Sequence, residues 1–385
     1  METMSLIPNR LRKNHSLYKS DLNRTFSAQK GWLPIALSAV ITLSCNHNQQ
    51  SAKNEIVRRT DTSKTISGAP DTITPRIEQL NRLIGANPRS ADLLWKRGKL
   101  EEFQKNYSAA LSDYNNAVRL DSSKASYYYD LSDVDFAIGQ TRAAKDALIK
   151  SVALDPKNTD AMLKLSELFF YVKKYHDAFD YVNRAIKVNP YIAKAYFLKG
   201  MIYVETADTA RAISSMQTAV EQDTKYYDAY IQLGLLLARK HNPLAVDYFN
   251  SAITIKPDDK EAYYDKSMFY QTVGDYKNAI NSYLDLLQLD SAYKYALYNL
   301  GFIYYNLDKP DYNKAMYYFN KTIVSDSSYS YAYYSRGNCY LQFNEPKKAL
   351  ADFDHAVRLN PGFTPASDAF RALKAKLKNR ATSAR

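Results

Sequence analysis

The sequence has few cysteines, few glycines and no recognisable catalytic motif. Its 2 cysteines, Cys45 and Cys339, are too few for a disulfide framework. Its 11 glycines form no glycine-rich phosphate loop, and no GxSxG or HExxH pattern occurs. We therefore expect no enzymatic activity, no cofactor and no metal site. Cys339 is interpreted as a core residue, and His176, one of 5 histidines, as a surface residue.

The excess of positive charge lies at the two ends of the chain. The 52 Lys and Arg residues against 40 Asp and Glu give a net charge of +12. Residues 1–44 carry six basic and two acidic residues, and residues 364–385 carry six basic and one acidic, which leaves +3 for residues 45–363. A long central region with nearly balanced charge argues against a phosphate-binding stripe, so we expect no nucleic-acid partner.

One alanine recurs at an interval of about 34 residues. The positions are Ala110, Ala144, Ala178, Ala212, Ala245, Ala279, Ala315 and Ala349. A fixed period of this length predicts a solenoid of stacked two-helix repeats. The interval shortens by one residue near Asn242-Pro243 and lengthens by two near Lys309-Pro310. We expect locally altered helix packing at those two places.

A second small residue lies about twelve positions before each alanine. The set is Gly98, Ser132, Ser166, Gly200, Gly234, Ser267, Gly301 and Gly337. Apolar residues at helical spacing surround both positions, so each repeat is interpreted as two amphipathic helices. The two small residues indicate where those helices approach closely. A larger side chain at such a contact would cost roughly 1–3 kcal/mol.

This pattern resembles the tetratricopeptide repeat family. The eighth repeat shows it in Gly337, Tyr340, Ala349, Phe353, Ala356 and Pro361, and the seventh in Leu300, Gly301, Tyr304, Ala315 and Phe319. The resemblance covers residues 91–363, with repeats that begin at Ala91, Ala125, Thr159, Ala193, Tyr227, Lys260, Lys294 and Ser330. It implies an all-α, right-handed superhelical solenoid of about eight two-helix repeats. It also implies a non-enzymatic scaffold that binds a protein or peptide segment.

Amphipathic segments flank the repeats on both sides. Residues 74–90 place Ile77, Leu80, Leu83 and Ile84 at helical spacing, and residues 364–385 place Phe370, Leu373 and Leu377 on one face. Terminal repeats of a solenoid need a polar outer surface. We therefore expect an N-terminal capping helix and a C-terminal capping helix that ends in a basic tail.

A basic leader with a short apolar core begins the chain. The apolar core, residues 32–44, is shorter than the ~20 residues that a membrane-spanning helix needs, but it fits a secretory signal. Because the core ends at Cys45, residues 1–45 resemble a bacterial lipoprotein signal, although Thr42 replaces the usual leucine. The resemblance implies lipidation of Cys45 and anchoring in the bacterial cell envelope, at the outer membrane or periplasmic face. The polar residues 46–73 are expected to form a disordered tether.

In the tetratricopeptide repeat family, which this sequence resembles, the first helix of each repeat lines the inner surface, chiefly through its fifth and ninth residues. In repeats four to seven these residues, with Tyr305 added, are apolar or aromatic: Phe197, Met201, Ile231, Leu235, Tyr264, Met268, Tyr298, Phe302 and Tyr305. An exposed apolar strip favours a groove for a partner's peptide or helix, so these nine residues are the predicted partner-binding set. The alternative is that some of them pack against the neighbouring repeat. Asn338 is the one asparagine at a ninth position, so the family's carboxylate clamp is not expected.

The principal hypothesis is a lipid-anchored scaffold of the cell envelope that binds a protein segment. One alternative is a cytoplasmic adaptor with the same repeats and an inert leader. The other is a module that binds glycans on its aromatic side chains. No small-molecule substrate is expected under the principal hypothesis.

Overall fold

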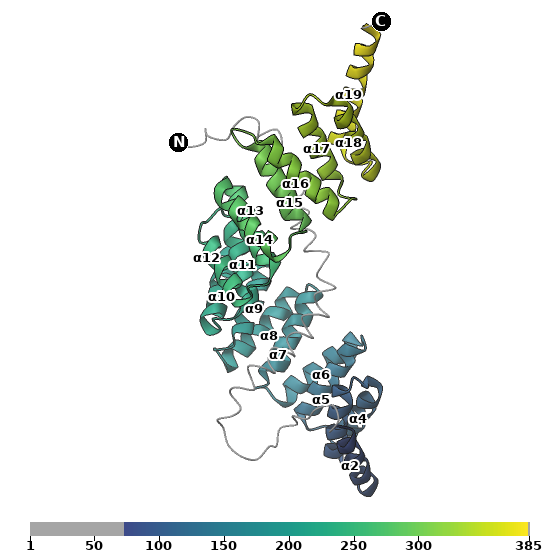
Figure 1. Cartoon of the computed structure of the whole chain (residues 1–385). Helices are drawn as coiled ribbons and strands as arrows, with labels where there is room; N and C mark the ends of the chain where they lie inside the picture. Colours follow the sequence, from purple (N-terminus) through teal and green to yellow (C-terminus); the bar gives the residue numbers. More distant parts are fainter. Residues whose placement is uncertain (1–72, 384–385) are drawn as a thin grey trace. The chain divides into compact units, whose positions relative to one another are not determined.

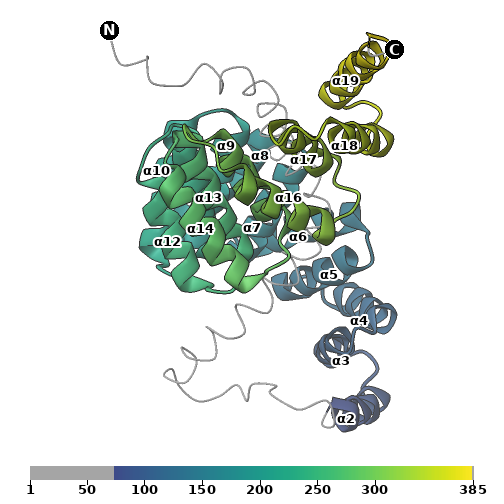
Figure 2. The same cartoon turned by 45° about the horizontal axis from the view of Figure 1, so that its top comes forward.

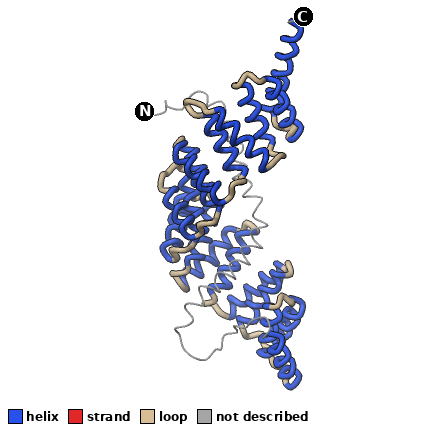
Figure 3. Tube along the Cα trace, viewed as in Figure 1, coloured by secondary structure: helices blue, strands red, loops and turns tan. Residues whose placement is uncertain are grey.

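The computed structural model describes residues 73–383, and every regular element in that range is an α-helix (Figures 1 and 3). The eighteen helices of this range, α2 to α19, pack in consecutive pairs, which confirms the expected all-α fold of two-helix repeats. The leader of residues 1–45, with Cys45, and residues 46–72 of the tether lie outside the described residues. From residue 73 onward, no helix combines the length and the apolar character that crossing a membrane requires.

The described residues form two compact units: the N-terminal unit, residues 73–289, and the C-terminal unit, residues 290–383. In the N-terminal unit the first helices of the repeats are α3 (Ala91–Phe103), α5 (Ala125–Ala137), α7 (Thr159–Tyr171), α9 (Ala193–Glu205), α11 (Tyr227–Ala238) and α13 (Lys260–Val273). The second helices are α4 (Tyr107–Leu120), α6 (Thr141–Leu154), α8 (Tyr175–Val188), α10 (Thr209–Gln222), α12 (Ala245–Ile255) and α14 (Tyr276–Leu289). The helix α2 (Ile73–Ala86) precedes them and packs on α3.

The C-terminal unit contains two further repeats and a final helix. The repeats are α15 (Lys294–Asn306) with α16 (Tyr312–Ser325), and α17 (Ser330–Gln342) with α18 (Pro346–Leu359). The last helix, α19 (Thr364–Ser383), packs against α18 (Figure 2). Phe363, just before α19, and Ala366 within it are buried beside Tyr333 and Ala356. All first helices begin at the residues where the sequence places the starts of the repeats.

The recurring small residues lie at the contacts between paired helices. All eight recurring alanines are fully buried. In the repeats with glycine, the glycine of the first helix faces a large side chain of the second helix, four residues after the recurring alanine. In repeat one this side chain is Tyr114, and a Cβ atom on Gly98 would lie only 2.7 Å from its Cε1 atom. Where serine replaces glycine, its hydroxyl is satisfied locally, and Ser166 Oγ donates to the carbonyl oxygen of Ala178 at 2.8 Å. The close approach inferred from the sequence is therefore present.

The turn inside most repeats uses one residue in the left-handed conformation. Seven repeats place their fifteenth residue there: Lys105, Gly139, Lys173, Ala207, His241, Gly274 and Asn344. At Lys173, with φ 58°, the next residue, Lys174, donates its backbone N–H to the carbonyl of Phe169 at 2.8 Å. This bond satisfies a carbonyl that the helix end leaves open. The turn geometry thus depends on backbone bonds more than on glycine.

The two irregular intervals change the second helix or the turn. In repeat five, α12 begins at Ala245 itself, whereas the other second helices begin three residues before their alanine. In repeat seven, the two extra residues lengthen the turn between α15 and α16, and no residue of that turn has a positive φ. Both changes stay local, as expected from the positions of Pro243 and Pro310.

The interpretation of Cys339 as core is also confirmed, since it is fully buried and burial raises the pKa of its thiol to about 12.

Candidate partner-binding surface

Charged and polar side chains join the first helices of repeats one and two. Trp95 Nε1 on α3 donates to Asp130 Oδ2 on α5 at 2.6 Å, and Lys99 Nζ lies 3.6 Å from the same oxygen. Trp95 and Lys99 are the fifth and ninth residues of their repeat, and Asp130 is the sixth residue of the next. Burial raises the pKa of Asp130, while Lys99 and the Trp95 hydrogen bond oppose that shift. The Oδ2 atom of Asp130 therefore links the first helices of repeats one and two.

The same kind of link continues along repeats two to four. Lys164 on α7 pairs with Asp133 on α5, and its Nζ lies 3.9 Å from the ring centroid of Tyr129. Lys194 Nζ on α9 lies 2.8 Å from Glu167 Oε1 on α7. Burial opposes the charge of Lys164, but Asp133 and Tyr129 outweigh it and the pKa of Lys164 is raised. The charged ninth residues of repeats one to three thus connect neighbouring first helices.

In repeats four to six the fifth and ninth residues are apolar or aromatic. We define the first-helix face as these residues of α9, α11 and α13 together with Asp265, the sixth residue of α13: Phe197, Met201, Ile231, Leu235, Tyr264, Asp265 and Met268. Phe197 and Met201 are half-buried and pack against a cluster that includes Leu233 and Leu236 of α11. The Phe197 ring also lies 5.2 Å from that of Tyr226. These side chains join adjacent repeats and keep part of their surface accessible.

The remaining apolar members of the face differ in exposure. Tyr264 and Met268 on α13 are half-buried, and the Tyr264 ring lies 6.2 Å from that of Tyr283. Ile231 and Leu235 on α11 are buried, with 6% and 9% of their surface exposed. They contribute to the core, as the alternative interpretation of these positions allowed. Their contact with a partner stays a prediction, as it does for the more exposed members.

Three of the nine predicted partner-binding residues lie on α15, in the C-terminal unit. Tyr298, Phe302 and Tyr305 are each half-buried. The Tyr298 ring lies 5.7 Å from Phe319, and the Tyr305 ring lies 5.4 Å from Tyr312. The nine residues therefore divide into six on the N-terminal unit and three on the C-terminal unit, and each group offers its own aromatic surface.

Asp265 is a site residue that the sequence analysis did not single out. It lies on α13 between Tyr264 and Met268, and its Oδ2 is buried with no hydrogen-bond partner among the described residues. Burial raises the pKa of Asp265 well above its ordinary value, and the negative charges of Glu261 and Asp259 add to the shift. The sequence does contain a signal for this residue. If the sixth residue of each repeat is compared with the fifth and ninth residues of the preceding repeat, Asp265 is found opposite two residues that have no hydrogen-bond donor in their side chains.

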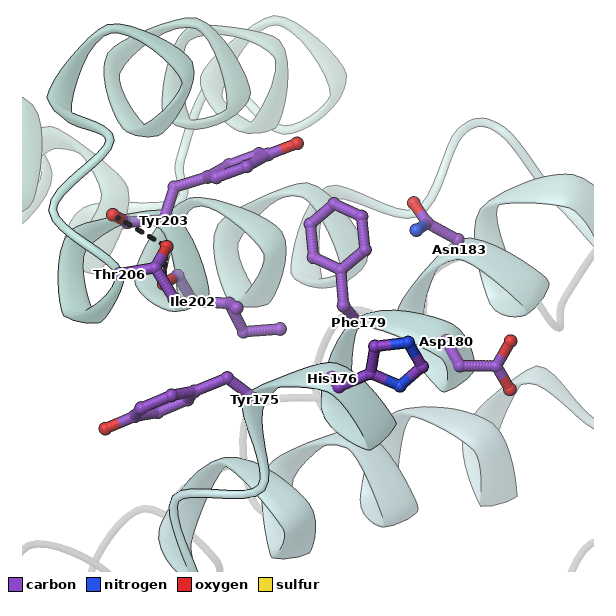
Figure 4. Close-up of a pocket in the computed structure, with 8 residues that line it drawn as sticks. All are labelled: Tyr175, His176, Phe179, Asp180, Asn183, Ile202, Tyr203 and Thr206. Carbon is purple, nitrogen blue, oxygen red and sulfur yellow. Dashed lines mark hydrogen bonds between the residues drawn. The ribbon is translucent and has the colours of Figure 1, made fainter.

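A shallow cavity of about 370 Å³ lies elsewhere in the N-terminal unit, between α8 and α9 (Figure 4). Its lining consists of Tyr175, His176, Phe179, Asp180, Asn183, Ile202, Tyr203 and Thr206. The rings of Phe179 and Tyr203 meet edge to face at 5.2 Å, and Tyr175 donates its hydroxyl to Glu205 Oε2 at 3.2 Å. His176 is exposed, as expected. The cavity combines aromatic walls with an amide and a carboxylate.

Acidic, histidine and cysteine side chains do not gather into a metal site within the part of the chain that the structure describes. The distinctive side chains of the candidate surface are aromatic rings, methionine thioethers and carboxylates. None of the described arrangements pairs a nucleophile with a base that is oriented by a third group.

Family profiles described as tetratricopeptide repeat match residues 77–125, 125–158, 193–226, 260–293, 295–326 and 330–363, together more than half of the chain. Anaphase-promoting complex subunit 3 from Schizosaccharomyces pombe is 25% identical over 142 residues, which cover 37% of this chain and 21% of that protein. Its counterpart from Dictyostelium discoideum is 32% identical over 80 residues, which cover 21% and 8%. The chain thus spans about a fifth or less of these curated relatives.

Among solved structures, the C-terminal part of a TPR repeat-containing protein from Cytophaga hutchinsonii has a similar fold. It is 19% identical, with a TM-score of 0.51, and the match covers 58% of this chain and 93% of that one. At this identity the likeness concerns the fold alone.

Proposed function

Because the chain belongs to the tetratricopeptide repeat family, we propose that it is a non-enzymatic interaction scaffold that binds a segment of a partner protein. The proposal places the partner on the first-helix face of α9, α11 and α13. Stacked helical repeats build extended surfaces of this kind, and short segments bind them through side chains that enter apolar sites. The relatives named above are, by their names, subunits of a multiprotein complex, which supports the same class of function.

One observation carries the proposal: the change in chemistry along equivalent positions of the first helices. In repeats one to three the ninth residues are charged and are paired with the next repeat. In repeats four and six the ninth residues are Met201 and Met268, both partly exposed. Flexible methionine side chains beside aromatic rings suit a surface that adapts to an apolar ligand. The Met201 and Met268 side chains keep part of their surface accessible, and the Met268 sulfur also accepts the Tyr283 hydroxyl at 3.0 Å.

The test is partner capture by the purified chain, compared between wild type and a surface variant. Replacing Met201 and Met268 by Ser should abolish the capture of specific partners, because it removes apolar contact area from the first-helix face. Capture followed by quantitative mass spectrometry measures this, and circular dichroism checks that helicity is retained. Partners captured equally by both proteins would contradict the proposal.

A matched control replaces three exposed apolar residues away from these positions. Val172, Tyr191 and Val324 are 54%, 75% and 88% exposed. Replacing all three by Ser makes the protein more polar without touching the first-helix face, so capture should remain at the wild-type level. Loss of capture in this control as well would mean that general hydrophobicity, and not the face, retains the partners.

We further propose that the chain is lipid-anchored at Cys45 in the bacterial cell envelope, with residues 46–72 as a tether between the anchor and α2, which begins at Ile73. The support is the apolar core that ends at this cysteine. Labelled palmitate should be incorporated into the wild-type chain in a bacterial host and not into Cys45→Ala. An unlabelled wild-type chain would favour the alternative, a cytoplasmic adaptor that uses the same repeats.

A second candidate function, glycan binding, is favoured by the cavity between α8 and α9. Tyr175, Phe179 and Tyr203 supply aromatic walls, and Asn183 and Asp180 supply polar atoms. Isothermal titration with soluble cell-wall glycans measures this directly. A heat of binding that is measured for the wild-type chain and for Phe197→Ala, but not for Phe179→Ala, would support a glycan site in this cavity. If no glycan binds to the wild-type chain, glycan binding is ruled out and the protein-binding proposal stands alone.

A further inference from the structure

Asp265 and Asp130 occupy the same position in their repeats but differ in their partners. Each is the sixth residue of a first helix, and α13 packs directly on α11 as α5 packs on α3. Asp130 receives the Trp95 N–H at 2.6 Å and the Lys99 ammonium at 3.6 Å. The Asp130 carboxylate thus accepts one neutral donor and lies beside one cation.

The donors that serve Asp130 are missing in front of Asp265. The residues that correspond to Trp95 and Lys99 in repeat five are Ile231 and Leu235, which carry no polar side-chain atom. Both are buried. Consistently, Asp265 Oδ2 is buried and has no hydrogen-bond partner within residues 73–379. A buried polar atom in this state calls for a specific explanation, and a ligand from outside the chain is one.

The charges close to Asp265 are predominantly negative. Glu261 lies one helical turn away on α13, and Asp259 caps the same helix by accepting the N–H of Glu261 at 2.9 Å. Both interact unfavourably with a charged Asp265. Lys256 interacts with the Glu261 carboxylate, and its ammonium lies 3.8 Å from the ring centroid of Tyr227, but no basic group of the described residues is among those that shift the pKa of Asp265. The site therefore favours a positive charge that comes from outside the chain.

We propose that Asp265 is the specificity-determining residue of the first-helix face and that it binds a lysine or arginine side chain of the partner segment. The ammonium or guanidinium takes the place that Lys99 takes beside Asp130. Apolar residues that flank this cation in the partner pack on Tyr264 and Met268, the neighbours of Asp265 on α13. The inference rests on the proposed function and adds to it the chemistry of the partner: a segment with one basic residue between apolar ones.

A charge-assisted contact of this kind gives strong selectivity for the basic residue. The experiment selects a random dodecapeptide phage library on the purified chain and on three variants. Wild type should enrich Lys or Arg at one fixed position between apolar residues. Asp265→Asn should lose that enrichment, and Asp265→Lys should enrich Asp or Glu there instead. A synthetic copy of the best wild-type peptide should bind Asp265→Asn about tenfold more weakly.

Asp130→Asn is the matched control, because its carboxylate is already occupied by Trp95 and Lys99. This variant should select the wild-type peptides, whatever its effect on the melting temperature. Identical selections on wild type and Asp265→Asn would overturn the role of Asp265 while leaving peptide binding in place. A library that yields no enriched sequence on wild type would overturn both the proposed function and this inference. Circular dichroism of each variant excludes loss of fold as the cause.

Discussion

The ring of Phe249 on α12 fills the space that a side chain on Gly234 of α11 would occupy. A Cβ atom on Gly234 would lie 2.5 Å from Cε1 of Phe249, closer than non-bonded carbon atoms approach. Phe249 is fully buried, and closely packed protein interiors leave such a ring little room to move. Gly234→Ala should therefore destabilise the chain by roughly 1–3 kcal/mol, visible as a lower midpoint in chemical denaturation.

Gly85 on α2 provides the control for this substitution. A Cβ atom there would meet nothing within 4 Å, and the residue is helical. Gly85→Ala should be neutral or stabilise by up to about 1 kcal/mol, since alanine loses less entropy on forming a helix. Equal destabilisation by both substitutions would contradict the close contact between α11 and α12.

The ion pair between Lys164 and Asp133 should contribute measurably to stability. Lys164 lies between two helices, so its removal leaves the Asp133 carboxylate without its cation in a partly buried site. We expect Lys164→Ala to cost roughly 2–3 kcal/mol. Lys96, the sixth residue of repeat one, pairs with Asp92 in an exposed position. Lys96→Ala should cost less than about 0.5 kcal/mol, and a similar loss at both sites would argue against the inter-repeat link.

The left-handed residue of the repeat turn predicts a stabilising substitution. Lys173 has φ 58°, a conformation that costs a side chain of L chirality roughly 1 kcal/mol and that glycine adopts freely. Lys173→Gly should raise the melting temperature. Lys174, with φ −86°, is the neighbouring control, and Lys174→Gly should give no increase. Thermal unfolding followed by circular dichroism compares the two.

Glu102 makes stability depend on pH. Burial raises its pKa from 4.5 to about 7, against the opposing effect of the Tyr114 hydroxyl, which donates to Glu102 Oε2 at 2.7 Å. The folded chain therefore holds this proton more tightly than the unfolded chain. The resulting stability is present below pH 4.5 and is lost as pH rises through about 7.

Glu102→Gln should remove this contribution, which amounts to roughly 1–3 kcal/mol between those limits. The measurement is the free energy of unfolding against pH for wild type and variant. Glu101→Gln, a substitution at the adjacent residue, should keep the wild-type slope. A slope unchanged by Glu102→Gln would show that this carboxyl does not retain its proton in the folded chain.

The repeat architecture was predictable because it depends on local size constraints that recur with a fixed period. Ala178 and Ser166 mark a helix contact whatever surrounds them, since no larger side chain fits. The start of each first helix followed from the same period. The turn was less predictable, because Lys105 and Lys173 adopt a conformation that sequence statistics assign to glycine, and only backbone hydrogen bonds make it favourable.

The candidate site was only partly predictable, because exposure depends on neighbours from other repeats. Met201 and Leu235 both occupy a ninth position, yet the first is half-buried and the second is buried. The difference lies in how the adjacent repeats pack and not in the residue type. The role of Asp265 was equally hard to predict. Asp265 and Asp130 occupy the same position in their repeats, and they differ only in the side chains of the preceding repeat that face them.

The central claim is that a partner lies on the first-helix face, and site-specific photocrosslinking tests it most directly. The chain is produced with p-benzoylphenylalanine in place of Met201 or Met268, or in place of the exposed Val172 or Tyr191, and is irradiated in its native cells. The account predicts a discrete adduct with a partner protein from the first two positions and none from the other two. Adducts only from Val172 or Tyr191 would contradict it.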